Sequence, residues 1–331
     1  MKIINRIYFE AFFRINFLLI LVFLFCYCNR ENSNEPDINS ISISIKIDRF
    51  DKLFHKSDSK QIPEIKERYP FLFPAKFHDS VWINRQKDTL QLLLLNEVEK
   101  SFPKMDFLES EIKKLFQHIK FYFPSTKTPH VIGLINNVDY QNKIIYRDSL
   151  LIISLDTYLG DSNLLYEGIP KYIRQEMDEK YLTSHIAEKF ADSKILSPMN
   201  KSFLTQMIFY GKKLYLKDVL MPKKSDEIKI GYNRNQINWA VENEKYIWEY
   251  ILERKLLYKN DTSLKKRFID PSPFSKFYLE IDNESPGKIG QWLGWQIVRS
   301  FSVNNPEVQL SDILSMPAET LFKKSSYKPS R

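Results

Sequence analysis

The stretch HVIGLINNVDYQNKIIYRDSLLIISL, residues 130–155, decides the fold. It holds three short runs rich in Ile, Leu and Val, at residues 130–136, 144–146 and 150–155, and Asn, Asp and Ser separate the runs. Such runs bounded by turn-forming residues are typical of β-strands. The alternating segment SISISIKI, residues 40–47, predicts one further strand. We therefore expect these four segments to form one small sheet.

The rest of the chain shows apolar residues at helical spacing. Seven segments have this pattern, and Pro103 and Pro124 close the first two: residues 86–102, 106–123, 170–177, 179–191, 201–220, 236–258 and 287–301. A small sheet packed on many helices predicts a predominantly helical α+β fold. No repeat or strong linker follows residue 47, and 43% of the 331 residues are hydrophobic. We therefore expect residues 40–331 to form a single domain with a sizeable core.

The net charge of +8 raises the question of nucleic-acid binding. The longest basic block is Lys265, Lys266 and Arg267, and the other basic residues are spread along predicted helices with acidic neighbours. This pattern is typical of solvated helix faces rather than a phosphate-binding stripe, so no nucleic-acid partner is expected. The positive net charge also suits a protein that lies close to anionic lipid headgroups.

The N-terminus has the pattern of a secretory signal. Lys2, Arg6 and Arg14 precede the apolar run FLLILVFLF, residues 17–25, and polar sequence follows residue 28. An apolar core of this length is typical of a signal peptide and is shorter than the roughly 20 residues of a transmembrane helix. We assign residues 1–27 to the signal peptide; an uncleaved anchor helix is the alternative.

Both cysteines stand at the end of the apolar run. A cysteine at this place resembles the lipid-attachment site of a bacterial lipoprotein, which two or more acyl chains anchor stably to a membrane. We predict lipidation of Cys28, because polar sequence begins directly after it, with Cys26 as the alternative. A small residue usually precedes the modified cysteine, whereas Tyr27 stands at this position here. The other interpretation is that both cysteines are ordinary residues of the signal peptide. Residues 28–39 are mostly polar and predict a tether.

A search for catalytic motifs finds none. The sequence contains no HExxH, GxSxG, P-loop or GxGxxG pattern, and no cysteine follows residue 28. His118 lies in an apolar helical segment, where a buried, hydrogen-bonded side chain is expected rather than a metal ligand. The sequence thus predicts no metal, no cofactor and no enzymatic activity.

The segment 271–301 carries the most distinctive polar pattern. Its three carboxylates alternate along what we expect to be an extended segment, so that they would project to one side as acid–base groups or Ca²⁺ ligands. Favourable charge at a helix N-terminus is the alternative. Gly290 and Gly294, four residues apart, predict close approach of another element. The candidate interaction surface is Glu280, Asp282, Glu284, Trp292 and Trp295.

Several segments resemble the GldB family of gliding-motility lipoproteins of Bacteroidetes. They span nearly the whole chain after the signal: DRFDKLF (48–54), RYPFLFP (68–74), DSVWI (79–83), LFQHIKFYFP (115–124), DSLLIISLDTYLG (148–160), FLTQMIFYGKKLYLKDVLMP (203–222) and RFIDPSPFSKFYLEIDNESPGKIGQWLGWQIVRSF (267–301). The resemblance implies a lipid-anchored protein of the cell envelope that faces the periplasm. It also implies a role in gliding together with the motility and secretion machinery; inner or outer membrane stays open.

The order of elements also resembles a zincin-like metalloprotease scaffold. There, one helix carries HExxH and a later helix supplies a Glu before a Gly. In this chain the first motif reads AEKFA, so Ala187 and Ala191 occupy the histidine positions, Glu188 is retained, and Tyr210 stands at the later Glu position. An Ala methyl cannot bind zinc, which needs about three protein ligands in a catalytic site. The resemblance therefore implies a protease scaffold without its metal site.

Three functions follow from these patterns. The first is a non-enzymatic envelope component of the gliding machinery. The second is a periplasmic lipoprotein that binds a glycan, a peptide or another ligand. The third is an atypical hydrolase that uses Glu188 or the carboxylates of residues 280–284 on the degenerate scaffold.

Overall fold

The computed structural model describes residues 35–329, and the chain separates into two compact units with the boundary after Ser42. In the first unit, helix α2 (Glu35–Ser40) occupies part of the segment for which a tether was expected. The predicted signal peptide, Cys26 and Cys28 lie outside the described residues.

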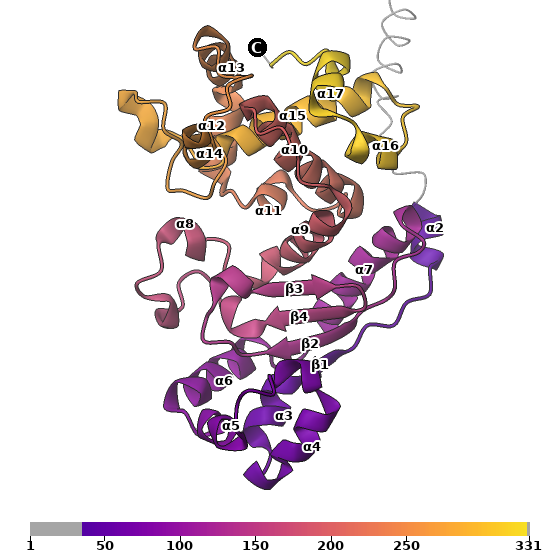
Figure 1. The fold of residues 1–331 in the computed structure, drawn as a ribbon, viewed down its shortest axis with the longest axis vertical. Coiled ribbons are helices and arrows are strands. Elements are labelled where there is room, and N and C mark those ends of the chain that lie inside the picture. The colour runs from indigo at the N-terminus through magenta and orange to yellow at the C-terminus, as the bar shows by residue number, and fades with distance from the viewer. Residues whose placement is uncertain (1–34, 330–331) are drawn as a thin grey trace, which may run out of the picture. The chain divides into compact units, whose positions relative to one another are not determined.

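The second unit, Ile43–Arg331, contains one four-stranded sheet (Figure 1). Its strands are β1 (Ile47–Arg49), β2 (His130–Leu134), β3 (Ile144–Arg147) and β4 (Leu150–Ser154), in the order β1-β2-β4-β3. β1, β2 and β4 run parallel to their neighbours, and β3 pairs antiparallel with β4. The predicted α+β class and the strands within residues 130–155 are thus confirmed.

The first strand was predicted too early in the chain. Residues 41–46 lie outside the sheet, although Ile43, Ile45 and Ile47 are buried and Ser44 is exposed. The parallel register aligns Ile47 with Val131, and an extension by two residues backwards would bring residue 45 opposite Pro129. Proline has no N–H to donate, so the ladder cannot extend there. The alternation therefore records one-sided burial of an extended segment and not strand pairing.

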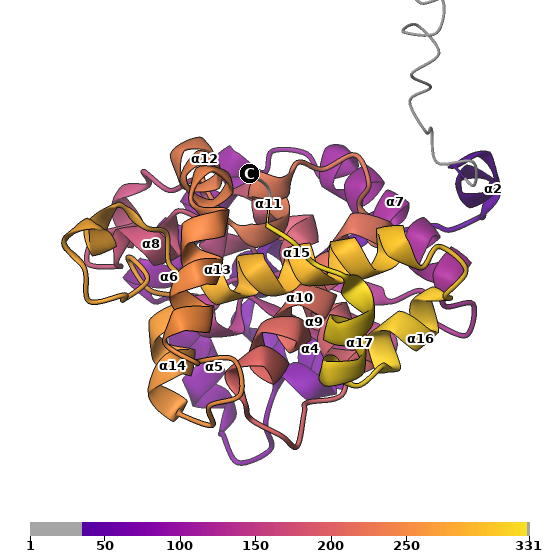
Figure 2. The same cartoon turned by 90° about the horizontal axis from the view of Figure 1, so that it is seen from above.

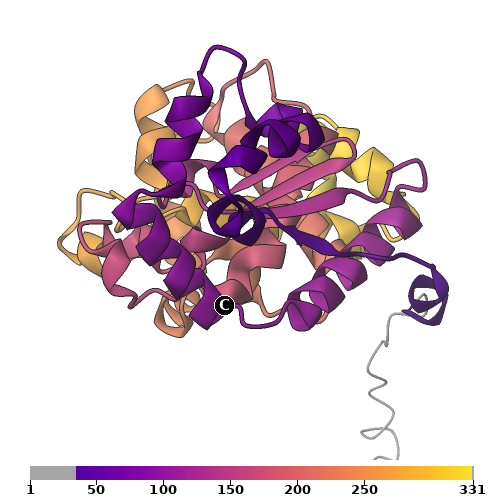
Figure 3. The same cartoon turned by 90° about the horizontal axis from the view of Figure 1, so that it is seen from below.

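Four helices surround the N-terminal part of the sheet: α3 (Phe50–Lys56), α4 (Ile62–Arg68), α5 (Asp79–Gln86) and α6 (Thr89–Ser101). Figure 3 shows them in the foreground, with the strands behind. Side chains from these helices and from the turns between them form one apolar cluster with Ile132 of β2: Phe50, Phe54, Tyr69, Phe73 and Trp82. The sequence predicted α6 but not α3, α4 or α5, because two turns or fewer carry little periodicity.

A succession of long helices connects the sheet to the C-terminal part. α7 (Asp106–Tyr122) and β3 both pack against α9 (Leu182–Lys194), which packs against α10 (Phe203–Leu220). Figure 2 shows α15 (Ile289–Asn304) lying across α10. A Cβ on Gly294 would come within 1.8 Å of the carbonyl oxygen of Met207, so the close approach predicted at this glycine is confirmed.

The predicted helix 236–258 is two helices, α12 (Arg234–Glu242) and α13 (Glu244–Glu253). They are separated at Asn243, whose side-chain amide donates to the carbonyl of Trp239 and so ends α12. The remaining helices are α8 (Lys171–Arg174), α11 (Asp226–Ile230), α14 (Thr262–Phe268), α16 (Leu310–Ser315) and α17 (Ala318–Ser325). Short 3₁₀ helices are Ser59–Gln61, Pro70–Leu72, Tyr140–Asn142, Leu155–Thr157, Leu164–Tyr166, Glu179–Tyr181 and Glu280–Glu284. Within residues 35–329, no helix has both the length and the apolar character needed to span a membrane.

Candidate functional site

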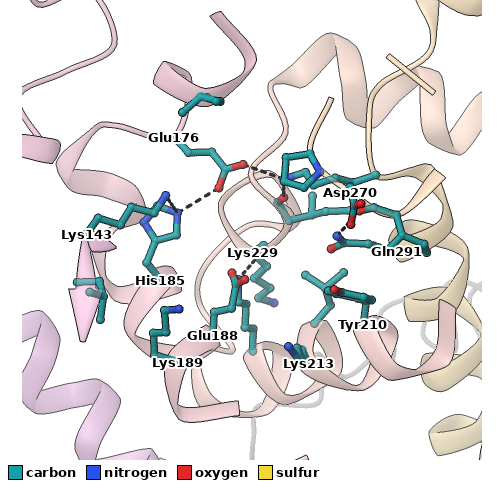
Figure 4. A pocket seen from close by; sticks show the side chains of 18 of the residues that line it. Lys143, Glu176, His185, Glu188, Lys189, Tyr210, Lys213, Lys229, Asp270 and Gln291 are labelled. Carbon is teal, nitrogen blue, oxygen red and sulfur yellow. Dashed lines mark hydrogen bonds and ion pairs between the residues drawn. The ribbon is translucent and has the colours of Figure 1, made fainter. Parts of the chain in front are cut away.

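A cavity of about 420 Å³ lies where β3, α9, α10 and the N-terminal end of α15 meet (Figure 4). Its wall combines charged side chains with aliphatic and tyrosine side chains, and Figure 4 shows side chains from these separate elements turned toward the same hollow. The lining side chains that matter most below are Lys143, Glu176, His185, Glu188, Tyr210 and Lys288. A volume of this size is typical of a site for a small ligand.

Helix α9 contributes one face to the cavity. His185, Glu188 and Lys189 all line it, since residues three and four apart lie on the same side of a helix. Ala187 and Ala191 are fully buried and are not part of the lining. The helix thus presents its charged face to the cavity and its small apolar residues to the protein interior.

His185 is the centre of a buried polar network. Its Nε2 atom lies 3.1 Å from a carboxylate oxygen of Glu176 and 3.0 Å from Nζ of Lys143, and its Nδ1 atom lies 3.0 Å from the hydroxyl of Tyr158. Burial, together with the positive charge of Lys143, lowers the pKa of His185 to about 4. The imidazole is therefore neutral near pH 7. Burial also lowers the pKa of Lys143.

Glu176 is held by cations and by a glycine. Burial by itself raises the pKa of this carboxyl group, but Lys288, followed by the hydrogen bond to His185, holds the pKa well below its ordinary value. The Nζ atom of Lys288 lies 2.7 Å from the carboxylate and donates to the carbonyl of Ile230. Gly231 has φ +78°, and a Cβ there would come within 2.3 Å of the Glu176 carboxylate. The fold therefore requires glycine at this position.

Glu188 is tied to a buried lysine. Its carboxylate lies 3.1 Å from Nζ of Lys217, which also donates to the carbonyl of Lys229 at 2.9 Å. The Lys217 side chain is 5% exposed, whereas that of Glu188 is 48% exposed and faces the cavity. Burial raises the pKa of Glu188, but Lys217 and then His185 outweigh this effect and lower it to about 2. Glu188 is thus a permanently ionised group that neutralises a cation of the wall.

The family described as "Gliding motility protein GldB" matches residues 31–329. The chain belongs to the GldB family. No curated protein and no solved structure matches it. The family match contains every segment that lines the cavity, from Tyr140 to Gln291.

The two tryptophans predicted at an interaction surface of this GldB-family chain are core residues. Trp295 is fully buried, and its indole N–H donates to Asp218 at 2.7 Å, while the guanidinium of Arg299 lies 3.7 Å from its ring centre. Trp292 is 3% exposed and donates to Glu244. Their place on the inner side of α15, against α10, explains the correction: helix packing buries them.

The three carboxylates of the predicted surface do not alternate along an extended segment. They belong to the 3₁₀ helix Glu280–Glu284. Asp282 accepts hydrogen bonds from the backbone N–H groups of residues 277–279, at 2.9 to 3.3 Å, so it fixes the preceding turn. Glu280 and Glu284 are exposed. The prediction of a one-sided acidic strip is therefore wrong, because local backbone hydrogen bonding decides the conformation here.

The four zincin-like positions are brought together only in part. Glu188 and Tyr210 line the same cavity, but Ala187 and Ala191 face the interior. Within residues 35–329, no three His, Cys, Asp or Glu side chains are placed to hold a metal ion. His118 is buried, with Nδ1 3.0 Å from the carbonyl of Lys114, as expected of a satisfied side chain.

Sequence reasoning missed most of the cavity network. Lys143, Glu176 and Lys288 come from three separate segments, and no local pattern connects them. One signal was present: His185 lies three residues before Glu188, which places both on one face of the predicted helix.

Proposed function

We propose that this protein is a lipid-anchored lipoprotein of the cell envelope that serves as a non-enzymatic component of the gliding machinery. The observation that carries the proposal is the GldB-family match over residues 31–329. The signal-like N-terminus that ends at Cys28 supports the lipid anchor and an orientation toward the periplasm. Its partners are then the membrane and other proteins of the motility or secretion machinery.

The residues at the zincin-like positions support a non-enzymatic role. Ala187 and Ala191 provide methyl groups where a zinc site needs ligands, and the Glu188 carboxylate is engaged by Lys217. In our proposal α9 is the degenerate active-site helix of a zincin-like scaffold, since Glu188 and Tyr210 still line one cavity beside the sheet. The neutral Tyr210 replaces the carboxylate of such a site.

The anchor and the motility role are tested together. In a gliding strain that lacks this gene, the wild-type gene should restore movement, whereas Cys28→Ser should lose both radiolabelled palmitate and movement. Cys26→Ser is the matched control and should retain both. Palmitate labelling of the Cys28 variant but not of the Cys26 variant would show that Cys26 carries the lipid. Failure of the wild-type gene to restore movement in a strain that expresses it would overturn the motility role.

The cavity favours a second candidate, a periplasmic ligand-binding lipoprotein. A hollow of about 420 Å³ with both apolar and charged side chains in its wall suits a small ligand such as a glycan or peptide fragment. Native mass spectrometry of the protein released from cells would show a bound molecule of defined mass. The hydrolase alternative predicts stoichiometric zinc in protein purified without added metal, together with peptidase activity that Glu188→Gln abolishes; either result would overturn the non-enzymatic proposal.

A further inference from the structure

A second hollow continues the cavity along β3. It encloses about 480 Å³ and is lined from β3 by Tyr146 and Arg147 and from α9 by Phe190 and Lys194. The first cavity is lined by Lys143, which directly precedes β3, by Ile144 of β3, and by His185 and Lys189 of α9. Successive turns of α9 thus face successive residues of β3, and the two hollows follow one line between the strand and the helix. We call this line the β3–α9 groove.

We propose that the β3–α9 groove docks an extended acidic segment of a partner protein, which adds to the sheet beside β3. The inference takes its biological setting from the proposed role in the gliding machinery, but it is argued from the backbone and charges of the groove alone. It names the chemistry of the partner that this role requires.

The backbone of β3 has unpaired groups on its outer side. β3 is an edge strand, and Ser154 donates its backbone N–H to the carbonyl of Lys143 at 3.0 Å. Hydrogen-bonded pairs alternate along an antiparallel ladder, so Ile145 and Arg147 bond to β4, whereas the N–H and C=O groups of Ile144 and Tyr146 point away from the sheet. Within the described part of the chain these outward groups have no hydrogen-bond partner. Such an edge can accept one more strand.

The groove carries more positive than negative charge, although Glu176 and Glu188 act on Lys143 from beyond ion-pair distance. No carboxylate of residues 35–329 lies within ion-pair distance of Lys143, Arg147 or Lys194, although Lys194 rests over the rings of Phe123 and Phe190. The acidic residues along the groove are already paired: Glu188 with Lys217, Asp148 with Lys127, and Asp192 with Lys213. The surplus is therefore cationic, and complementary charge on a partner would be acidic.

The spacing of these cations favours a chain over a small anion. Lys143 directly precedes β3 and Arg147 is its last residue, so the two are roughly 13 Å apart for four residues at about 3.3 Å each. A single carboxylate or phosphate group cannot contact both ends. An extended segment with acidic side chains at alternate positions contacts both cations and also forms hydrogen bonds with the outward backbone groups between them.

The test uses the full-length lipoprotein in detergent micelles and a fluorescein-labelled ten-residue peptide of alternating Glu and Thr. Fluorescence anisotropy should show saturable binding. Arg147→Gln and Lys194→Gln should each weaken it about threefold to fivefold, as expected for removal of one solvent-accessible ion pair. Lys143→Gln should weaken it as well, although this side chain also belongs to the buried network around His185. Lys266→Gln, which removes an exposed cation from α14, is the matched control and should bind as the wild type does. Equal affinity of the three groove variants and the control would overturn the proposal, as would absence of binding.

A second peptide separates strand addition from simple charge attraction. A peptide with the same Glu and Thr side chains, in which every backbone nitrogen carries a methyl group, keeps the charges but cannot donate a backbone hydrogen bond at any position. It should bind at least about tenfold more weakly, because two or more backbone hydrogen bonds between the peptide and β3 are lost. Equal binding of the two peptides would overturn strand addition.

Arg147 and Lys194 are side chains at the rim, so these two variants remain informative if Lys143→Gln unfolds the protein. If the protein binds the peptide but cells move without it, only the proposed motility role is wrong. If the protein restores movement but does not bind the peptide, only this inference is wrong.

Discussion

Gly211 of α10 and Gly294 of α15 are in direct backbone contact: a Cβ on Gly211 would come within 2.2 Å of the carbonyl carbon of Gly294. The two helices therefore cross with their backbones touching, and this crossing joins the cavity-bearing helices to the C-terminal helices. Because Trp295 follows Gly294 directly, the same contact fixes the place of the buried indole.

Gly211→Ala should destabilise the protein despite the better helix propensity of alanine. Propensity alone would add about 0.5–1 kcal/mol of stability. The new methyl group has no space, and overpacking of this kind costs about 1–3 kcal/mol or more because backbone must move. Urea denaturation should show a lower midpoint. As a control, Asn238→Ala on the exposed face of α12 should be neutral or slightly stabilising; an equally stable Gly211→Ala variant would contradict the helix crossing.

Trp295→Ala should report on stability and not on a binding surface. Removal of a fully buried tryptophan that donates to Asp218 should cost about 3–5 kcal/mol of unfolding free energy. Glu284→Ala, an exposed residue of the same C-terminal region, should change stability by no more than about 0.5 kcal/mol. Thermal unfolding of both variants provides the comparison. A Trp295 variant as stable as the wild type would place this side chain outside the core.

His185 should make stability depend on pH between about 6.5 and 4. Its pKa is about 4 in the folded protein and 6.5 ordinarily, so the unfolded chain binds the proton more readily in this range. The stabilising contribution is present above pH 6.5 and is lost as the pH falls through 4, by up to about 3 kcal/mol. His185→Gln should remove this loss. Asn238→Ala, which removes no titratable group, provides the control and should leave the profile unchanged.

The pH measurement needs the difference between variant and wild type. Burial raises the pKa of Asp156 to about 6, so this residue adds stability as the pH falls from 6 toward its ordinary value near 3.8 and opposes His185. The two effects partly cancel in the wild-type curve, whereas subtraction of the His185→Gln curve leaves the histidine contribution. A flat difference curve between pH 6.5 and 4 would show that His185 is not buried in a neutral state.

Gly231→Ala should cost more stability than Gly168→Ala. Both glycines have positive φ angles, +78° and +85°, so both substitutions pay about 1–2 kcal/mol for a left-handed backbone. Only at Gly231 would the added carbon meet the Glu176 carboxylate, while the space at Gly168 is open. Guanidinium denaturation of the two variants isolates this extra cost. Equal losses would mean that Glu176 does not lie against Gly231.

Part of the fold could be predicted from local pattern alone. The strands within residues 130–155 and the helices α7, α10 and α15 follow from the spacing of their apolar residues, because each element buries one face and that face repeats with the period of the element. The glycine at 294 likewise signalled a close helix contact. The predicted extent of the first strand was wrong because the alternation at residues 40–47 reflects burial of one side. Pairing with the sheet depends on Pro129, which lies far along the chain.

The sequence by itself determined the fold class, the family, and the helix face that presents His185 and Glu188 together. Only the tertiary structure decided that Lys143 and Lys288, which are far apart in the sequence, converge on Glu176 and His185. Helical and strand periods encode which side of an element is buried, but not which other element covers it. The convergence of charged side chains depends on that second choice, which the helix crossing at Gly211 and the edge position of β3 fix in three dimensions.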